Sequence, residues 1–228
     1  MPRLTRLTPD TAVGASRDLL ADLVSRHGQI GDMVSTMAHS PAVLGGYLQL
    51  SRAMGRAKLD RRVSERISIA VQALQGCRVC LDSHVNAARA MGVDEEEIER
   101  ARTGTSADPA IAAIITLALQ IYREPTSITD EQVIALGEYG YSDRAIADVV
   151  GVVALNILTG AFNLLAGLTP RATPVPRDIP ACTRGARPPR RARAPPRGYG
   201  RNQPCVCSPS ATTVSCSVPK SSPCSAPG

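Results

Sequence analysis

Four residues of this 228-residue chain have the types and the spacing to do chemistry together, in the pattern E-x11-C-x-x-C-x-x-x-H. They are Glu65, Cys77, Cys80 and His84. On a helix the two cysteines and the histidine share one face, because residues three, four and seven apart lie above one another. Gly76 is expected to end the preceding helix, so both thiols fall in the first turn of the next one. There, unpaired backbone N–H groups and the helix dipole favour the thiolate, which indicates redox-active thiols.

The histidine and the glutamate could handle protons for those thiols. His84 follows Cys80 by one helical turn and can exchange a proton with its sulfur. Glu65 lies in a mostly apolar run of the preceding helix. A carboxylate that points inward from that run could orient the imidazole or relay protons, the part that a third group takes in catalytic triads. We therefore expect all four residues to be catalytic.

Two interpretations without redox chemistry stay open for the same residues. A C-x-x-C-x-x-x-H segment supplies three ligands of the kind that zinc prefers. A fourth ligand is not evident: His27 and His39 show no ligand spacing, and the C-x-C at 205 and 207 gives weak support. The cysteines could also be inert and structural. Redox chemistry without a bound metal or other cofactor is favoured because four potentially reactive residues occupy compatible helical positions.

The composition changes abruptly at Pro170. Residues 171–228 hold 10 basic residues and one acidic residue, whereas residues 1–170 hold 16 basic and 19 acidic residues, so the pI of 9.2 belongs to the tail. The tail contains 12 of the 18 prolines and has no Leu, Met or Phe. We therefore predict a globular domain over 1–170 and a disordered tail over 171–228. The tail is expected to be solvated and to bind no specific nucleic acid, and a frame-shifted extension of a GC-rich gene is a further hypothesis for it.

The elements that position the four residues are expected to be helices throughout. Apolar residues recur with a period of 3.6 between Thr8 and Gly167, and no sustained alternation indicates a sheet. Helix starts are predicted mostly at residues of the capping type, and several predicted helices end at a glycine. The predicted starts are Ser16, Ser40, Asp60, Cys77, Asp94, Asp108, Thr129 and Ser142. The predicted fold class is all-α.

One apolar stretch has the length of a membrane span. Val149 to Leu168 runs 20 residues without a charge. It contains Asn156 and Asn163, seven residues apart and hence on one helix face, so a buried core or subunit-interface helix is favoured over a span. The N-terminus has positive charge with no apolar run behind it, unlike a signal peptide. We expect a cytoplasmic protein that does not bind membranes.

The sequence resembles the alkylhydroperoxidase D-like, or carboxymuconolactone decarboxylase, superfamily over about residues 10–168. The resemblance rests on the E-x11-C-x-x-C-x-x-x-H core, on RHGQIGDMVSTMAHSPAVLGGYLQLSRAMG before it, and on ARAMGVDEEEIERARTG and VVALNILTGAFNLLAG after it. It implies an all-helical bundle and a homotrimer or homohexamer. The peroxidase branch carries the C-x-x-C, whereas the decarboxylase branch, which acts on a lactone by acid–base chemistry, generally lacks it.

What the resemblance implies for the reaction is specific. Cys80 would attack a hydroperoxide and become a sulfenic acid, Cys77 would resolve it to a disulfide, and His84 and Glu65 would relay protons. A dithiol, such as a lipoyl group or a thioredoxin-like protein, would reduce the disulfide. The chain departs from the alkylhydroperoxidase D proteins at Val79, where they carry a second relay histidine. A lactone decarboxylase and a redox switch without turnover remain alternatives.

Overall fold

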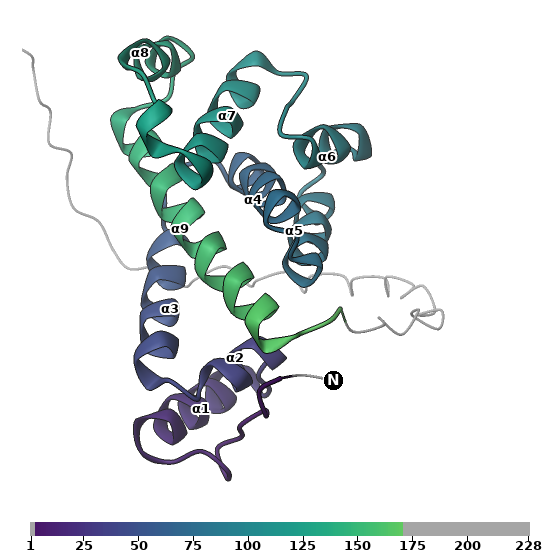
Figure 1. The fold of residues 1–228 in the computed structure, drawn as a ribbon, viewed down its shortest axis with the longest axis vertical. Helices are drawn as coiled ribbons and strands as arrows, with labels where there is room; N and C mark the ends of the chain where they lie inside the picture. Colours follow the sequence, from purple (N-terminus) through teal and green to yellow (C-terminus); the bar gives the residue numbers. More distant parts are fainter. Residues whose placement is uncertain (1–2, 171–228) are drawn as a thin grey trace, which may run out of the picture. The chain divides into compact units, whose positions relative to one another are not determined.

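The computed structural model describes residues 3–170, which form a bundle of α-helices without a strand in that range. The all-α prediction is confirmed, while the predicted tail 171–228, and with it the boundary at 170, involves residues outside the described ones. Figure 1 shows the helices in chain order. They are α1 (Gly14–His27), α2 (Asp32–Met37), α3 (Pro41–Met54), α4 (Arg61–Gln75), α5 (Arg78–Ala90), α6 (Glu95–Arg102), α7 (Pro109–Arg123), the 3-10 turn η1 (Pro125–Ser127), α8 (Asp130–Glu138) and α9 (Asp143–Ala166).

Side-chain caps fix most of the helix starts, as the sequence predicts. Each capping oxygen accepts a backbone N–H of the first turn that has no partner inside the helix. These N-caps are Ser40, Asp60, Asp94, Asp108, Thr129 and Ser142. The prediction is wrong for the first helix, which begins at Gly14. Ser16 is buried in its first turn and donates instead to the carbonyl of Ala38 at 2.5 Å. Helix α2 and the turn η1 were not predicted, because each is too short to show a period.

Helix α4 is the centre of the bundle, and α5, α6, α7 and α9 all pack against it. Its apolar face, which includes Ile67 and Val71, meets Ile114 of α7 and Val149 and Val153 of α9, and all five side chains are fully buried. Full burial of each such side chain contributes roughly 1.5–3 kcal/mol relative to exposure. This packing fixes α4, which carries Glu65, against α5, which carries both cysteines and His84.

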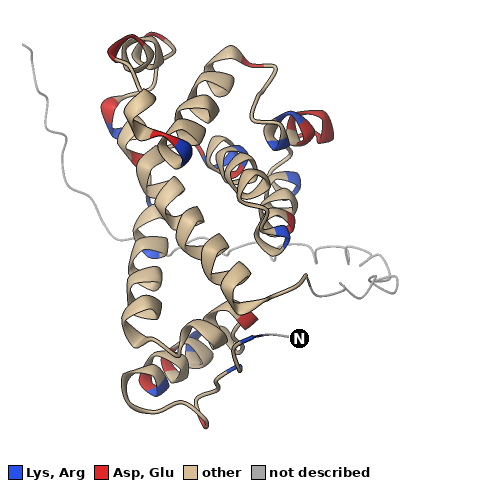
Figure 2. Ribbon diagram, in the orientation of Figure 1, with Lys and Arg blue, Asp and Glu red and all other residues tan. Residues whose placement is uncertain are grey.

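Helix α9 runs the length of the domain between α3 on one side and α4 and α5 on the other (Figure 1). By length and composition it could cross a membrane, yet one face of it is buried against α3, α4 and α7. Figure 2 shows it uncharged over most of its length, in contrast to the acidic α6. Asn156 and Asn163 both lie on its buried face, and Asn156 donates to Ser68 of α4 at 2.9 Å. The shared face predicted for the two asparagines is thus a buried one, which fits a core helix.

Candidate active site

A sharp turn between α4 and α5 brings the two thiols together. Gly76 ends α4 with a φ of 79°, a conformation that residues with a Cβ rarely adopt. Cys77 is then the N-cap of α5, and Cys80 lies in its first turn. The two sulfur atoms are free and buried, and they lie 2.6 Å apart. That separation is close enough for one proton to be shared between them and for a disulfide to form with little movement of the backbone.

The pair ionises as a unit rather than as two ordinary thiols. The Cys80 thiol and the backbone N–H groups of Val79 and Cys80 face the Cys77 sulfur and lower its pKa to about 6. The adjacent Cys77 sulfur, together with burial, raises the pKa of Cys80 well above its usual range. The expectation that the helix start lowers the pKa of both thiols is therefore wrong for Cys80, because two anions cannot coexist at this distance. At neutral pH the pair carries one negative charge.

His84 and Glu65 form the hydrogen-bonded pair that the sequence predicted for them. Glu65 is only 8% exposed, and its Oε2 lies 2.7 Å from Nδ1 of His84. Its other oxygen lies 3.7 Å from the guanidinium of Arg61, one turn earlier on α4. A carboxylate on Nδ1 fixes the ring orientation and leaves Nε2 for proton exchange. His84 makes no direct hydrogen bond to Cys80 in the described part of the chain.

Cys80, His84 and Glu65 line one cavity of about 720 Å³. Met54, Val152 and Leu155 give it apolar walls, and Val79 lies on its lining as well. Cys77 does not reach this lining, so a molecule in the cavity meets the sulfur of Cys80. The four predicted residues thus form one site, with Cys80 in front, Cys77 behind it and the His84–Glu65 pair beside it.

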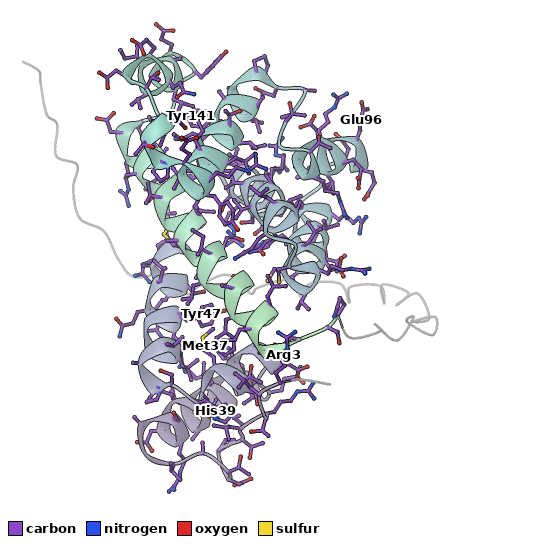
Figure 3. The ribbon with its side chains drawn as sticks, in the orientation of Figure 1. Arg3, Met37, His39, Tyr47, Glu96 and Tyr141 are labelled. Atoms are coloured by element: carbon purple, nitrogen blue, oxygen red, sulfur yellow. The ribbon has the colours of Figure 1, made fainter. Side chains whose placement is uncertain are left out.

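Two further residues of the site were not predicted. Asn163 of α9, which is 3% exposed, donates from Nδ2 to the sulfur of Cys80 at 3.1 Å. Tyr47 of α3 lines the cavity, and burial is the main cause that raises the pKa of its phenol, with a smaller contribution from the charge of Cys80. Figure 3 shows Tyr47 in the space between α3 and α9. The only signal in the sequence was the shared face of Asn156 and Asn163, which does not name a sulfur as the partner.

No cluster of three or more His, Cys, Asp or Glu that could hold a metal ion occurs among residues 3–170. The site's own residues are engaged with one another: thiol with thiol, and imidazole with carboxylate. The fold and the site together define a helical domain with a buried dithiol at the wall of a cavity.

Comparison with known proteins agrees with the helical fold. Residues 41–124, from the start of α3 to the end of α7, match the model of the carboxymuconolactone decarboxylase family. This segment contains Glu65, Cys77, Cys80 and His84. This match confirms the resemblance to the alkylhydroperoxidase D/carboxymuconolactone decarboxylase superfamily that the motifs indicated. Among curated proteins, none matches the chain significantly.

Several solved structures share the fold. An alkylhydroperoxidase AhpD core, an uncharacterized peroxidase-related protein from Ralstonia eutropha JMP134, is 18% identical with a TM-score of 0.65, over 75% of this chain and 93% of its own. An uncharacterized peroxidase-related protein from Silicibacter sp. TM1040 is 18% identical with a TM-score of 0.61, over 75% and 96%. The debrominase Bmp8 is 18% identical with a TM-score of 0.60, over 75% and 92%. Identities this low show a common fold.

Proposed function

We propose that the protein is a thiol-dependent peroxidase that reduces organic hydroperoxides through a dithiol/disulfide cycle at Cys77 and Cys80. The observation that carries this proposal is the 2.6 Å separation of the two sulfurs, with only Cys80 on the cavity wall. The sulfur of Cys80 can contact a substrate, and the sulfur of Cys77 lies next to it on the side away from the cavity. The ionised pair supplies the nucleophile at neutral pH, and the His84–Glu65 pair supplies a route for the proton.

The cycle balances without a metal, flavin or haem. The Cys80 thiolate attacks the distal oxygen of the hydroperoxide; the S–O bond forms, the O–O bond breaks, and the alkoxide leaves with a proton passed through His84. Cys77 then attacks the sulfur of the Cys80 sulfenic acid, which forms the disulfide and releases water. An external dithiol reduces that disulfide by exchange. Two electrons enter from the dithiol and two leave in the reduction of the peroxide to an alcohol and water.

The cavity favours a bulky substrate and a slender reductant. A volume of about 720 Å³ with apolar walls far exceeds what hydrogen peroxide needs and fits an alkyl or aryl hydroperoxide. The sulfur of Cys77 is buried behind Cys80, so a reductant must reach the pair through the same cavity. A lipoyl group on its flexible arm can enter there more easily than the flat face of a thioredoxin-like protein. Free thiols that cycle in this way belong in a reducing compartment, and we propose the cytoplasm.

The test is hydroperoxide consumption by the full-length, pre-reduced protein with excess dihydrolipoamide. We expect many turnovers with cumene hydroperoxide and none with a Cys80→Ser variant. The disulfide of the oxidised enzyme is identified by mass spectrometry after digestion with trypsin. Trypsin cleaves after Arg66, Arg78 and Arg89, so the disulfide joins two separate peptides, 67–78 and 79–89. One equivalent of peroxide consumed without turnover, and no further consumption with a thioredoxin system as reductant, would favour a redox switch instead. Activity on a lactone that survives loss of both cysteines would favour the decarboxylase.

A second candidate is reductive debromination of an aromatic ring. The debrominase Bmp8 shares this fold, and one of its structures is a complex with 2,3,4-tribromopyrrole. Removing bromide reductively also takes two electrons, which the Cys77–Cys80 pair can supply, and the cavity has room for a substituted ring. The same assay with 2,3,4-tribromopyrrole and bromide detection separates the two activities. Bromide release in the absence of peroxide turnover would replace the peroxidase proposal.

We also propose that identical subunits assemble through the outer face of α9. Its exposed residues alternate at spacings of three and four, which is the pattern of a seam between two packed helices. We call them the α9 stripe: Ala147, Val150, Ala154, Ile157, Ala161 and Leu164. Small residues at every second position allow close approach of a second helix, and the stripe continues for about 27 Å at 1.5 Å per residue. A second copy presents the same uncharged seam and is therefore the occupant that fits it.

A further inference from the structure

The buried amide of Asn163 lies against the reacting sulfur. Its Nδ2 donates to Sγ of Cys80 at 3.1 Å, from a helix 83 residues further along the chain. Its Oδ1 is also buried and has no hydrogen-bond partner among the described residues. A donor on a sulfur stabilises the thiolate over the thiol, whereas a buried acceptor without a partner costs about 1–3 kcal/mol. The N–H end of this amide therefore has a partner in the cysteine pair, whereas its oxygen has none in the described part of the chain.

The donor end bears on which sulfur carries the charge. Backbone N–H groups at the start of α5 favour the anion on Cys77, which does not reach the cavity. The Asn163 amide lowers the pKa of both thiols, but the sulfur to which its N–H donates is that of Cys80. It thus counteracts the helix start and shifts the shared proton from Cys80 toward Cys77. Without it, less of the charge would rest on Cys80, the sulfur that a substrate can reach.

The acceptor end is placed to serve the oxidised state. Oδ1 lies roughly 2.3 Å from Nδ2, from the bond lengths of an amide, and therefore at most about 5.4 Å from the sulfur. The thiolate offers it no proton. A sulfenic acid does, because its new O–H group is a donor attached to that sulfur. An acceptor that is unpaired in the reduced state would gain its partner when the oxygen atom is transferred.

We propose that Asn163 is a further catalytic residue of the peroxide reaction, whose Nδ2 holds the negative charge on Cys80 and whose Oδ1 accepts the O–H of the Cys80 sulfenic acid. The proposal rests on the proposed peroxidase function for its second part only. Attack by Cys80 forms the S–O bond and breaks the O–O bond, and the oxygen that stays on sulfur points its proton at Oδ1. Cys77 then attacks from its own side, and that oxygen leaves as water.

Other titratable groups face the same sulfur and must stay constant in a test. They are Cys77 of α5, Tyr47 of α3, and the His84–Glu65 pair; Asp32 and Arg61 also line the cavity. Substitutions at Asn163 leave all of them in place. Asn163→Leu removes both ends of the amide at a similar volume. Asn163→Asp keeps the shape and replaces the donor with a negative charge.

The first experiment measures the rate of iodoacetamide alkylation of Cys80 against pH in the full-length reduced protein. Mass spectrometry of peptide 79–89 reports Cys80 alone, without any peroxide. We expect the midpoint of the profile to rise by at least one pH unit in Asn163→Leu and further in Asn163→Asp, which lowers the rate near pH 6 by about fivefold or more. The matched control is Asn156→Leu, one heptad earlier on the same buried face, whose amide donates to Ser68. It is expected to lower the melting temperature and to leave the midpoint in place.

The outcomes separate this proposal from the peroxidase proposal. An unchanged midpoint in folded Asn163→Leu, or an equal shift in Asn156→Leu, would overturn the donor role whether or not the protein consumes peroxide. A shifted midpoint in a protein without peroxide turnover would uphold the donor role and overturn the peroxidase. The acceptor role is tested with one equivalent of cumene hydroperoxide in a Cys77→Ser background. Asn163→Leu should then shorten the lifetime of the dimedone-reactive sulfenic acid on Cys80 severalfold, and an unchanged lifetime would refute that role. If Asn163→Leu does not fold, Asn163→Asp gives the reading for the donor role, and Asn163→Ala replaces Asn163→Leu in the lifetime measurement, because the carboxylate of Asp would still accept the O–H of the sulfenic acid.

Discussion

Replacing Cys77 with serine tests whether the two thiols ionise as one unit. In the native pair the neighbouring Cys80 thiol and two backbone N–H groups face the Cys77 sulfur, which lowers its pKa to about 6. The first proton therefore leaves the pair near pH 6. A serine hydroxyl cannot carry that charge at any pH of interest, so Cys80 in the variant must ionise alone. Burial then raises the pKa of Cys80, and only the side-chain donors around it, chiefly the amide of Asn163, oppose that rise.

The size of the expected change follows from the two pKa values. A thiol with the ordinary value of 9.0 is about 1% ionised at pH 7, whereas a pair with a first pKa of about 6 is about 90% singly ionised. The midpoint of Cys80 reactivity against pH should therefore move up by roughly three units in Cys77→Ser. The rate at pH 7 should fall by up to about 90-fold, and by less if only part of the native charge rests on Cys80.

The assay is the alkylation of Cys80 between pH 5 and pH 10, read from peptide 79–89 in the full-length protein. Serine is close to cysteine in size, and the backbone N–H groups of the helix start remain available to its oxygen. The matched control is Cys182→Ser in the segment after residue 170, which removes a thiol and leaves both residues of the pair unsubstituted. A Cys77→Ser profile that still has its midpoint near pH 6 would refute the shared proton and would mean that Cys80 owes its reactivity to other groups.

Three further predictions concern the proton route, the core and the assembly. Glu65→Gln should lower the turnover of hydroperoxide by about 10²-fold while Cys80 alkylation stays unchanged, because the carboxylate orients the imidazole rather than the sulfur; equal losses in both assays would contradict that division. Gly160→Ala should lower the free energy of unfolding in urea by about 1–3 kcal/mol, because the added Cβ would collide with two glutamine side chains of α4. The control is Gly46→Ala at an exposed position with open space, which should raise the free energy of unfolding by up to about 1 kcal/mol. Ile157→Asp in the α9 stripe should reduce the mass measured by light scattering to that of a single chain. The control Ile134→Asp replaces a more exposed isoleucine on α8 and should leave the mass unchanged. Equal masses for both variants and the wild type would rule out this interface.

Much of the fold could be predicted from the sequence because its signals are local. A capping oxygen satisfies N–H groups two or three residues away, so Asp60 and Ser142 mark their helices whatever the rest of the chain does. The failure at the first helix has a tertiary origin. Ser16 has the type of a cap, but a tertiary contact with the carbonyl of Ala38 uses its hydroxyl, and the helix starts earlier. Competition between local and tertiary partners cannot be read from residue types.

The residues of the candidate site also differ in how far the sequence predicts their positions. The C-x-x-C and the histidine lie within eight residues, so helical geometry alone places them on one face. Glu65 comes from the preceding helix, and its inward direction depends on how α4 packs against α5, which the apolar run indicated but did not determine. Asn163 comes from α9, 83 residues away from its sulfur, and no spacing rule connects them.

The pKa of Cys80 shows why the position of a residue in a helix is not enough to predict its reactivity. The helix start favours a thiolate, and the rule applies well to Cys77, which caps the helix. It fails for Cys80 because a neighbouring sulfur at 2.6 Å outweighs the dipole, whose effect on a charge is typically 0.3–1 kcal/mol at exposed sites. Two thiols this close hold one charge, and the side that carries it depends on donors from elsewhere in the fold. The motif therefore predicts that a dithiol reacts, whereas the amide on α9 bears on which of its two sulfurs a substrate meets as a nucleophile.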